Sequence, residues 1–178
     1  LVVVDAEKGF GNGFCIPAGP LREPVKTGLA RADAVMSLGT NHAQTAFAKL
    51  WKNDIPCPHI TATLAALTTG MDWTEGKYVA FAGIGHPEKF FKTLEHLGAT
   101  LIHKEALSDH ATLSSALLKR LKYMAEENAA QLVTTEKDAV RLPQSFRTEV
   151  LSLPVRLLVD DALFLRQFVK DALKTADL

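Results

Sequence analysis

The sequence is poor in cysteine, has no long apolar run and carries no excess of either charge. Cys15 and Cys57 are its only cysteines, too few and too unpatterned for a disulfide framework or a zinc site. No apolar stretch approaches the roughly 20 residues that a membrane span needs, and no signal-peptide pattern is present. Basic and acidic residues each number 20. We therefore expect no overall field that attracts nucleic acid, and no nucleic-acid partner.

The composition that remains is that of an ordinary globular protein, with 47% hydrophobic and 22% charged residues. The chain opens on Leu1-Val2-Val3-Val4, the pattern of a strand buried on both faces of a parallel sheet. Soluble domains seldom begin inside such a strand. We therefore expect the sequence to be truncated at its N-terminus, so that a membrane anchor can have been lost with the missing part.

Short apolar runs alternate with helical patterns along the chain. The expected strands cover residues 1–4, 34–38, 60–67, 78–84, 99–103, 131–134 and 157–159, and the expected helices cover residues 23–32, 40–52, 87–97, 113–127 and 163–173. Strands and helices that alternate in this way predict an α/β protein with mostly parallel strands.

The predicted organisation has two α/β parts joined by two linkers. Residues 1–55 form the first part, 56–69 a linker strand, 70–150 a smaller α/β lobe, and 151–178 a return linker strand with the closing helix. The turn-rich segment from Thr69 to Lys77 marks the boundary between the parts. Two linkers suit lobes that close around a ligand and exclude water from a reaction.

Two glycine patterns suggest a nucleotide site, and we reject both. Gly70 to Lys77 imitates a phosphate-binding loop, but five residues separate Gly70 from Gly76, and Tyr78 replaces the required Ser or Thr. The segment 9–14 lacks the third glycine of a dinucleotide fingerprint. No other segment fits either pattern.

The segment from Gly11 to Pro24 is more informative, because it follows the carboxyl end of the first strand, where open α/β sheets bind ligands. Its prolines and glycines give the backbone a fixed path that ends at a helix N-terminus, which favours anions. Arg22 can hold a phosphate through its forked guanidinium, and Glu23 can orient that arginine or approach a metal. The alternative is a rigid surface loop in which Arg22 is solvated and Glu23 stabilises the first helical turn.

Two further segments carry candidate site residues. His110 follows Asp109 in a loop between a strand and a helix, where a histidine beside a carboxylate can accept a proton; the alternative is helix capping by Ser108 or Asp109. Lys137 and Asp138 follow the strand at 131–133, where Asp138 can accept hydrogen bonds from a nucleobase. The alternative at this second segment is also helix capping.

Taken in order, these segments resemble the tetraacyldisaccharide 4'-kinase family. The specific matches are Ile16-Pro17-Ala18-Gly19-Pro20-Leu21-Arg22-Glu23-Pro24 and Phe81-Ala82-Gly83-Ile84-Gly85-His86-Pro87-Glu88-Lys89-Phe90-Phe91. The shorter ones are Val2-Val3-Val4-Asp5-Ala6, the glycine loop 9–13, Asp109-His110 and Thr134-Thr135-Glu136-Lys137-Asp138-Ala139-Val140. The resemblance extends from Leu1 to about Leu142, and more loosely to the end of the chain.

The resemblance implies a phosphate-loop kinase that uses ATP and Mg²⁺ to phosphorylate the 4'-hydroxyl of tetraacyldisaccharide 1-phosphate, a step of lipid A synthesis at the cytoplasmic face of the Gram-negative inner membrane. Residues 1–55 then form the tail of the kinase core, and the membrane surface is reached through the missing N-terminal part. The family implies that His110, with Asp109, supports a catalytic aspartate, and that Arg22 and Glu23 line the nucleotide and magnesium region. Lys137 and Asp138 are our further nucleotide-binding candidates.

The sequence departs from the family in what it lacks. The phosphate-binding loop, the catalytic aspartate and the acidic Asp-Asp-Gly-Phe-Gln segment of the family all precede the position of Leu1. We therefore predict no metal site other than a contribution from Glu23, and no kinase activity for this polypeptide alone. Members also often carry an aromatic or polar residue soon after the Asp-His pair, where this chain has Ala111-Thr112-Leu113.

Two other functions stay open from the sequence. One is a non-catalytic nucleotide-binding or regulatory α/β domain on the same scaffold, and the other is a plain interaction module. The kinase hypothesis requires Arg22 and His110 to converge on one triphosphate cleft. An interaction module is favoured if Arg22, His110 and Asp138 lie far apart.

Overall fold

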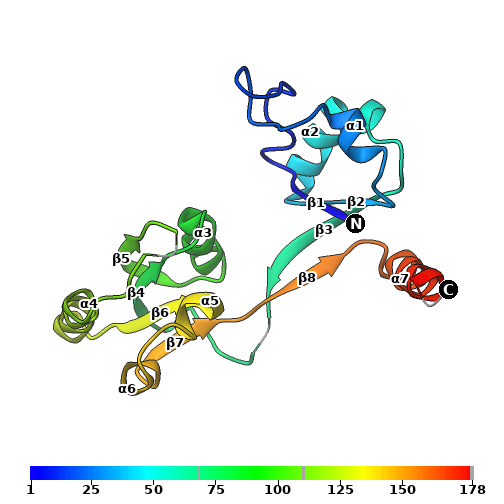
Figure 1. Ribbon diagram of the computed structural model, residues 1–178. Coiled ribbons are helices and arrows are strands. Elements are labelled where there is room, and N and C mark those ends of the chain that lie inside the picture. The colour runs from blue at the N-terminus through cyan, green and yellow to red at the C-terminus, as the bar shows by residue number, and fades with distance from the viewer. Residues whose placement is uncertain (68, 110, 177–178) are drawn as a thin grey trace. The chain divides into compact units, whose positions relative to one another are not determined.

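A computed structural model describes residues 1–67, 69–109 and 111–176 (Figure 1). The chain divides into two compact units. Unit 1 comprises Leu1–Ala65 and Leu157–Leu178, and unit 2 comprises Ala66–Arg156. Strands and helices alternate in both units, and the pairs β1–β2, β2–β3, β4–β5, β4–β6 and β6–β7 are parallel. The predicted α/β fold class is confirmed.

Unit 1 is built on a four-stranded sheet with helices on two sides. Its strands have the order β1-β2-β3-β8, with β1–β2 and β2–β3 parallel. The strands are β1 (Val2–Asp5), β2 (Val35–Leu38), β3 (His59–Ala66) and β8 (Val155–Val159). The helices are α1 (Val25–Leu29), α2 (Asn41–Trp51), the 3-10 helix η1 (Lys52–Asp54) and α7 (Ala162–Ala176).

Alternate residues of β2 face two separate cores, as a strand buried on both faces requires. Val35 is fully buried in a cluster with Phe47 of α2 and Leu29 of α1. Met36 belongs to a second cluster, against which Phe168 of α7 packs. Thus α1 and α2 cover one face of the unit 1 sheet, and α7 covers the other.

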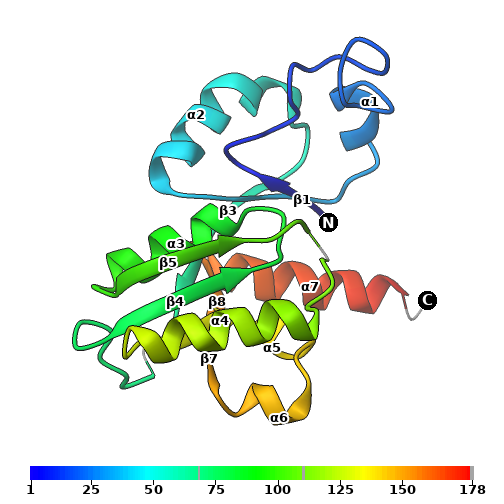
Figure 2. The same ribbon diagram turned by 90° about the vertical axis from the view of Figure 1, so that its left-hand side faces the viewer.

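Unit 2 is a sheet with the strand order β5-β4-β6-β7, in which every pair is parallel. The strands are β4 (Lys77–Ala82), β5 (Thr100–Ala106), β6 (Gln131–Thr135) and β7 (Val150–Leu153). The helices are α3 (Pro87–His96), α4 (Ser115–Glu127), α5 (Glu136–Ala139) and α6 (Gln144–Arg147). The helices α3 and α4 lie on opposite faces of this sheet (Figure 2).

The alternation along β4 produces this three-layered arrangement. Ala80 and Ala82 share a cluster with Phe91 of α3, whereas Val79 and Phe81 share another with Leu121 of α4. All six of these side chains have no accessible surface. The central strand of unit 2 therefore anchors both helix layers.

The structure differs from the predicted elements at several places. The predicted linker strand at 56–69 contains β3, whose residues 59–62 pair along β2 and so belong to the unit 1 sheet. The predicted return segment contains two strands, β7 and β8, and β7 pairs with β6. We did not predict β7, because four residues between turns carry little periodic signal. The units divide at Ala65/Ala66 and Arg156/Leu157.

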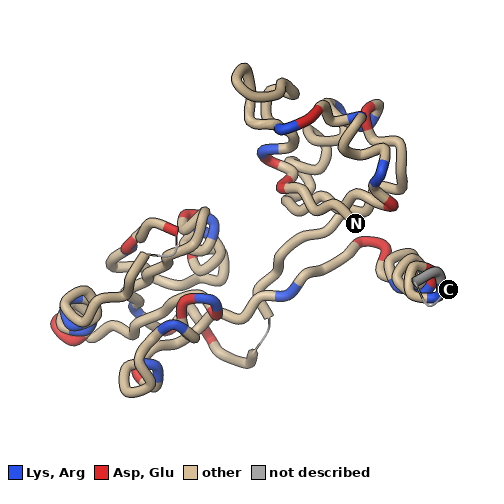
Figure 3. The backbone as a smooth tube through the Cα atoms, in the orientation of Figure 1, with Lys and Arg blue, Asp and Glu red and all other residues tan. Residues whose placement is uncertain are grey.

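Charged residues of both signs are interspersed along the backbone of both units, without a long tract of one sign (Figure 3). Within residues 1–67, 69–109 and 111–176, no helix has the length and apolar character needed to cross a membrane.

Candidate functional site

The loop between β1 and α1 is anchored on α2 by two of its glycines. Gly9 and Gly13 have φ angles of +52° and +78°, which side-chain-bearing residues rarely adopt. A Cβ atom on Gly9 would lie 2.5 Å from Nε1 of Trp51, the last residue of α2. The indole of Trp51 also packs edge-on against Phe10, with ring centroids 5.2 Å apart. Glycine is therefore required where this loop meets the helix.

Internal hydrogen bonds fix the rest of this loop. The Asn12 side chain donates to the Ala18 carbonyl at 2.9 Å and accepts from the Phe14 amide at 3.2 Å. The Ile16 amide donates to the Leu21 carbonyl at 2.8 Å, and the Ile16–Pro17 peptide bond is cis. The segment thus has a defined path that leads to Arg22, as its glycines and prolines predict.

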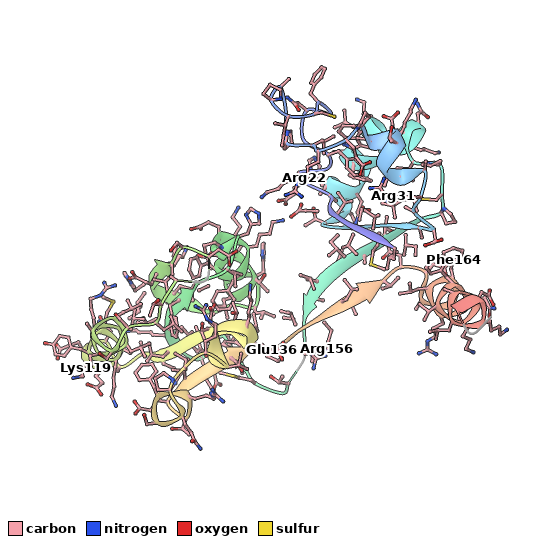
Figure 4. All side chains as sticks on the ribbon, in the orientation of Figure 1. Arg22, Arg31, Lys119, Glu136, Arg156 and Phe164 are labelled. Carbon is pink, nitrogen blue, oxygen red and sulfur yellow. The ribbon has the colours of Figure 1, made fainter. Side chains whose placement is uncertain are left out.

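Arg22 and Glu23 differ in what they can bind. The Arg22 side chain is exposed, and no acceptor or acidic group in the described part of the chain binds its guanidinium. Glu23 is engaged through both carboxylate oxygens by the Arg31 guanidinium (Figure 4 labels both arginines). These hydrogen bonds, aided by the charge of Arg31, lower the pKa of Glu23 despite some desolvation. Arg22 can therefore take an anion directly, whereas Glu23 is held by Arg31.

Sequence reasoning missed Arg31. It lies eight residues after Glu23, beyond the five-residue helix α1. No regular helix connects the two positions, so no i,i+3 or i,i+4 spacing indicates the pair.

Among the described residues, no group of three or more His, Cys, Asp or Glu side chains could hold a metal ion.

In unit 2, the carboxyl ends of β4 and β6 lie next to each other at the point where the chain changes direction across the sheet. From β4 the chain crosses to β5 on one side, and from β6 it continues to β7 on the other. Such a switch point is where open α/β sheets bind ligands. Gly83 follows β4 at this place, and Thr135 ends β6.

Asp138 occupies this switch point. Its side chain is fully buried, and one oxygen accepts from the Gly83 amide at 2.9 Å and from the Thr135 hydroxyl at 2.8 Å. The other oxygen accepts from Arg141 Nη1 at 3.0 Å. Thr135 in turn caps α5 by accepting from the Asp138 amide. This geometry supports the capping alternative, because a nucleobase could reach the carboxylate only by displacing these partners.

Lys137 and Asp109 lie at the same edge of the unit 2 sheet. Lys137 Nζ is 3.8 Å from Asp109 Oδ1, and both side chains are about half exposed. Asp109 follows β5, and Lys137 follows β6. The structure therefore brings Asp109, Lys137 and Asp138 to one edge, although the predicted residue His110 lies outside the described residues. Sequence reasoning did not single out Arg141, whose spacing of three residues from Asp138 is the only local signal.

Arg22 and Glu23 belong to unit 1, and Asp109, Lys137 and Asp138 belong to unit 2. The convergence of Arg22 and His110 on one cleft stays a prediction.

Two open cavities of about 340 and 420 Å³ lie along α7 in unit 1, and Phe164 lines both. Neither cavity contains any of the predicted site residues.

Comparison with known proteins shows one family. Its sequence model, that of tetraacyldisaccharide-1-P 4'-kinase, matches residues 1–174. The tetraacyldisaccharide 4'-kinase of Jannaschia sp. is 56% identical over 161 residues, which are 90% of this chain and 49% of that protein. The corresponding protein of Dinoroseobacter shibae is 55% identical over 162 residues, with 90% and 48% covered. The chain thus spans about half the length of these curated relatives.

A solved structure shares the fold. The crystal structure of LpxK from Aquifex aeolicus in complex with ATP aligns with a TM-score of 0.58 and 21% sequence identity, covering 88% of this chain and 47% of that one. The fold, the sequence model and the identities to curated relatives agree. The resemblance expected from the proline-glycine and Phe-Ala-Gly-Ile-Gly-His-Pro strings is confirmed: this chain belongs to the tetraacyldisaccharide-1-P 4'-kinase family.

Proposed function

We propose that the complete protein containing these residues transfers the γ-phosphoryl group of ATP to the 4'-hydroxyl of tetraacyldisaccharide 1-phosphate, in lipid A synthesis. The observation that carries this proposal is the family match over residues 1–174. The name of the curated relatives states the same reaction class, and the related LpxK structure contains ATP. We place the protein at the cytoplasmic face of the inner membrane, which it reaches through a part outside these residues.

The described side chains supply charge and position, which are the main requirements of phosphoryl transfer. Arg22 presents an unpaired, exposed guanidinium at the end of a fixed loop, and we assign it to oxygens of the nucleotide phosphates. Lys137 adds a second cation at the carboxyl edge of unit 2. We assign Asp109 and His110 to support of the group that accepts the proton of the 4'-hydroxyl.

Mg²⁺ supplies further charge neutralisation for such a transfer when it is bound. The described residues do not fit a magnesium site, because they contain no suitable cluster of ligands and because Arg31 binds both oxygens of Glu23. We therefore assign the metal ligands to another part of the protein. Glu23 can bind Mg²⁺ only if its carboxylate releases Arg31.

The test compares variants of the complete protein in an assay with ATP and tetraacyldisaccharide 1-phosphate. Arg22→Met should raise KM for ATP by a factor on the order of 10 to 100, since a hydrogen bond to a charged group contributes about 1.5–3 kcal/mol. Lys26→Met is the matched control, because this nearby exposed lysine pairs with Asp54 instead. The KM of this variant for ATP should stay within about twofold of the wild-type value, because an exposed ion pair contributes little.

Other outcomes distinguish the alternatives. If the complete protein binds ATP but transfers no phosphoryl group, the result would contradict the kinase proposal and favour a nucleotide-binding or regulatory domain. We also expect the 178-residue polypeptide alone to turn over no ATP, because phosphoryl transfer depends on a backbone cradle and metal ligands that we place elsewhere. Turnover by that purified polypeptide would contradict this assignment.

A further inference from the structure

Arg141 connects three separate segments of unit 2. Its Nη1 donates to Asp138 Oδ1 at 3.0 Å, and its Nη2 donates to the carbonyl oxygen of Ala111. Asp138 is itself bonded to the Gly83 amide at 2.9 Å. One guanidinium thus links the segment after β6 to the loop after β5. Through Asp138, it is also linked to the end of β4.

These groups are closely packed around Gly83. A Cβ atom placed on Gly83 would lie 3.3 Å from Asp138 Oδ1, 3.5 Å from the Ser108 carbonyl and 3.6 Å from Arg141 Nη1. The Asp138 side chain is fully buried, and that of Arg141 is 28% exposed. The contact between Arg141 and the loop is part-buried, and partial exclusion of water strengthens charge-assisted hydrogen bonds.

The described residues of the loop between β5 and α4 also make contacts at its two ends and within it. At its start the Leu107 amide donates to the Ala82 carbonyl at 2.9 Å, and at its end Ser114 caps α4. Between these points the Ala111 amide donates to the Ser108 carbonyl, a bond within the loop itself. The ion pair of Lys137 with Asp109 is about half exposed at 3.8 Å and constrains little. Arg141 thus holds the middle of the loop, at Ala111, through a part-buried hydrogen bond.

We propose that Arg141 is a positioning residue, which fixes the backbone at Ala111 and thereby sets where Asp109 stands in the phosphoryl-transfer site. This inference rests on the proposed function. It requires arginine in particular, because only a planar fork can reach the Asp138 carboxylate and the Ala111 carbonyl at once. A lysine at this position would keep the charge and satisfy one of the two acceptors.

The experiment compares Arg141→Lys with Arg147→Lys in the complete protein. Arg147 is the matched control, because it also binds backbone carbonyls of unit 2, those of Val140 at 2.7 Å and Leu142 at 3.1 Å, without touching the loop. Arg141→Lys should lower kcat by a factor on the order of 10 to 100, as small misplacements of reacting groups do. KM for ATP should change by less than about threefold, since the ATP-binding Arg22 is untouched.

A second readout does not depend on activity. Amide hydrogen exchange across residues 107–113 should accelerate in Arg141→Lys and stay at the wild-type rate in Arg147→Lys. Unchanged exchange in Arg141→Lys, or an equal loss of kcat in both variants, would overturn the inference. A loss of kcat fully explained by the unfolded fraction at the assay temperature would do the same. If the complete wild-type protein transfers no phosphoryl group, the proposed function fails first, and the positioning role falls with it.

Discussion

His59 shares a chain of hydrogen bonds with Ser37 and Gln44 on the face of the unit 1 sheet that α2 covers. Its Nε2 lies 2.7 Å from Ser37 Oγ, and the Ser37 hydroxyl donates to Gln44 Oε1 at 2.5 Å. Because that hydroxyl has one hydrogen, His59 Nε2 must be the donor to Ser37. The imidazole also packs against Phe47, with ring centroids 5.3 Å apart. Partial burial lowers the pKa of His59 below its ordinary value of 6.5.

This lowered pKa makes the stability of unit 1 depend on pH. Below about pH 6.5 the unfolded chain binds a proton that folded His59 resists, so folding stability falls as pH falls, by at most about 1.4 kcal/mol per pH unit. We expect His59→Gln to reduce this loss between pH 7.5 and 5. Urea unfolding followed by Trp51 fluorescence, in a Trp73→Phe background, measures it. An identical stability difference between the two proteins at both pH values would contradict the prediction.

The pair of Glu23 and Arg31 gives a second prediction for single residues. Because hydrogen bonds from Arg31 lower the pKa of Glu23, Arg31→Gln should raise that pKa towards the ordinary value of 4.5. NMR titration of the Glu23 carboxyl carbon measures the change. Lys26→Gln removes a neighbouring cation that pairs with Asp54, and it should leave the Glu23 titration where it is. A titration insensitive to Arg31→Gln would show that the pair does not form in solution.

Among the elements, α3 shows a close agreement between pattern and structure. Its stripe of Phe90, Phe91, Leu94 and Leu97 predicts a core-facing side, and the first three are buried while Leu97 is partly buried. Gly98 ends the helix with a φ of +90°, and a Cβ there would lie 2.5 Å from Thr74 Cγ2. The observed helix thus ends where the expected helix 87–97 ends, to within one residue. Helix periodicity suffices here because one face meets one sheet.

We expect Phe91→Ala to destabilise unit 2 by about 3–5 kcal/mol, since the ring has no accessible surface and its loss leaves a cavity. Thermal or urea unfolding followed by Trp73, which belongs to the same core cluster, measures the effect. Tyr123→Ala on α4 is the control, because that side chain is 64% exposed, and surface changes usually stay within about 0.5 kcal/mol. Equal losses in both variants would contradict the assignment of Phe91 to the core.

At the scale of the whole molecule, the two units differ in continuity. Unit 2 is one uninterrupted segment, whereas unit 1 needs Leu157–Leu178 to complete it. Within that return segment, Leu165 and Phe168 of α7 pack on the cluster of Ala34, Met36, Ile60 and Ala62. Residues 1–65 alone would therefore expose one face of their sheet.

This difference predicts how the parts fold. A polypeptide of residues 66–156 should unfold cooperatively with a stability on the order of 5 kcal/mol, as is usual for about 90 residues with their own core. A polypeptide of residues 1–65 should show no cooperative transition until residues 157–178 are joined to it. Circular dichroism during heating distinguishes the cases. A cooperative transition in residues 1–65 alone would show that α7 is dispensable.

The sequence by itself determined the fold class, most of the strands and helices, and the family, because period-2 and helical patterns and the two long motif strings are local features of the chain. It also singled out Arg22, Asp109, Lys137 and Asp138 as candidate site residues. Only the tertiary structure decided which partners the polar groups have: Asp138 with Gly83, Glu23 with Arg31, and Arg141 with Ala111. Strand order and register bring Asp138 to Gly83, 55 residues away, and no local spacing encodes that proximity. For this reason sequence reasoning left Asp138 open between base binding and capping, and only the tertiary structure shows its buried hydrogen bonds to Gly83, Thr135 and Arg141.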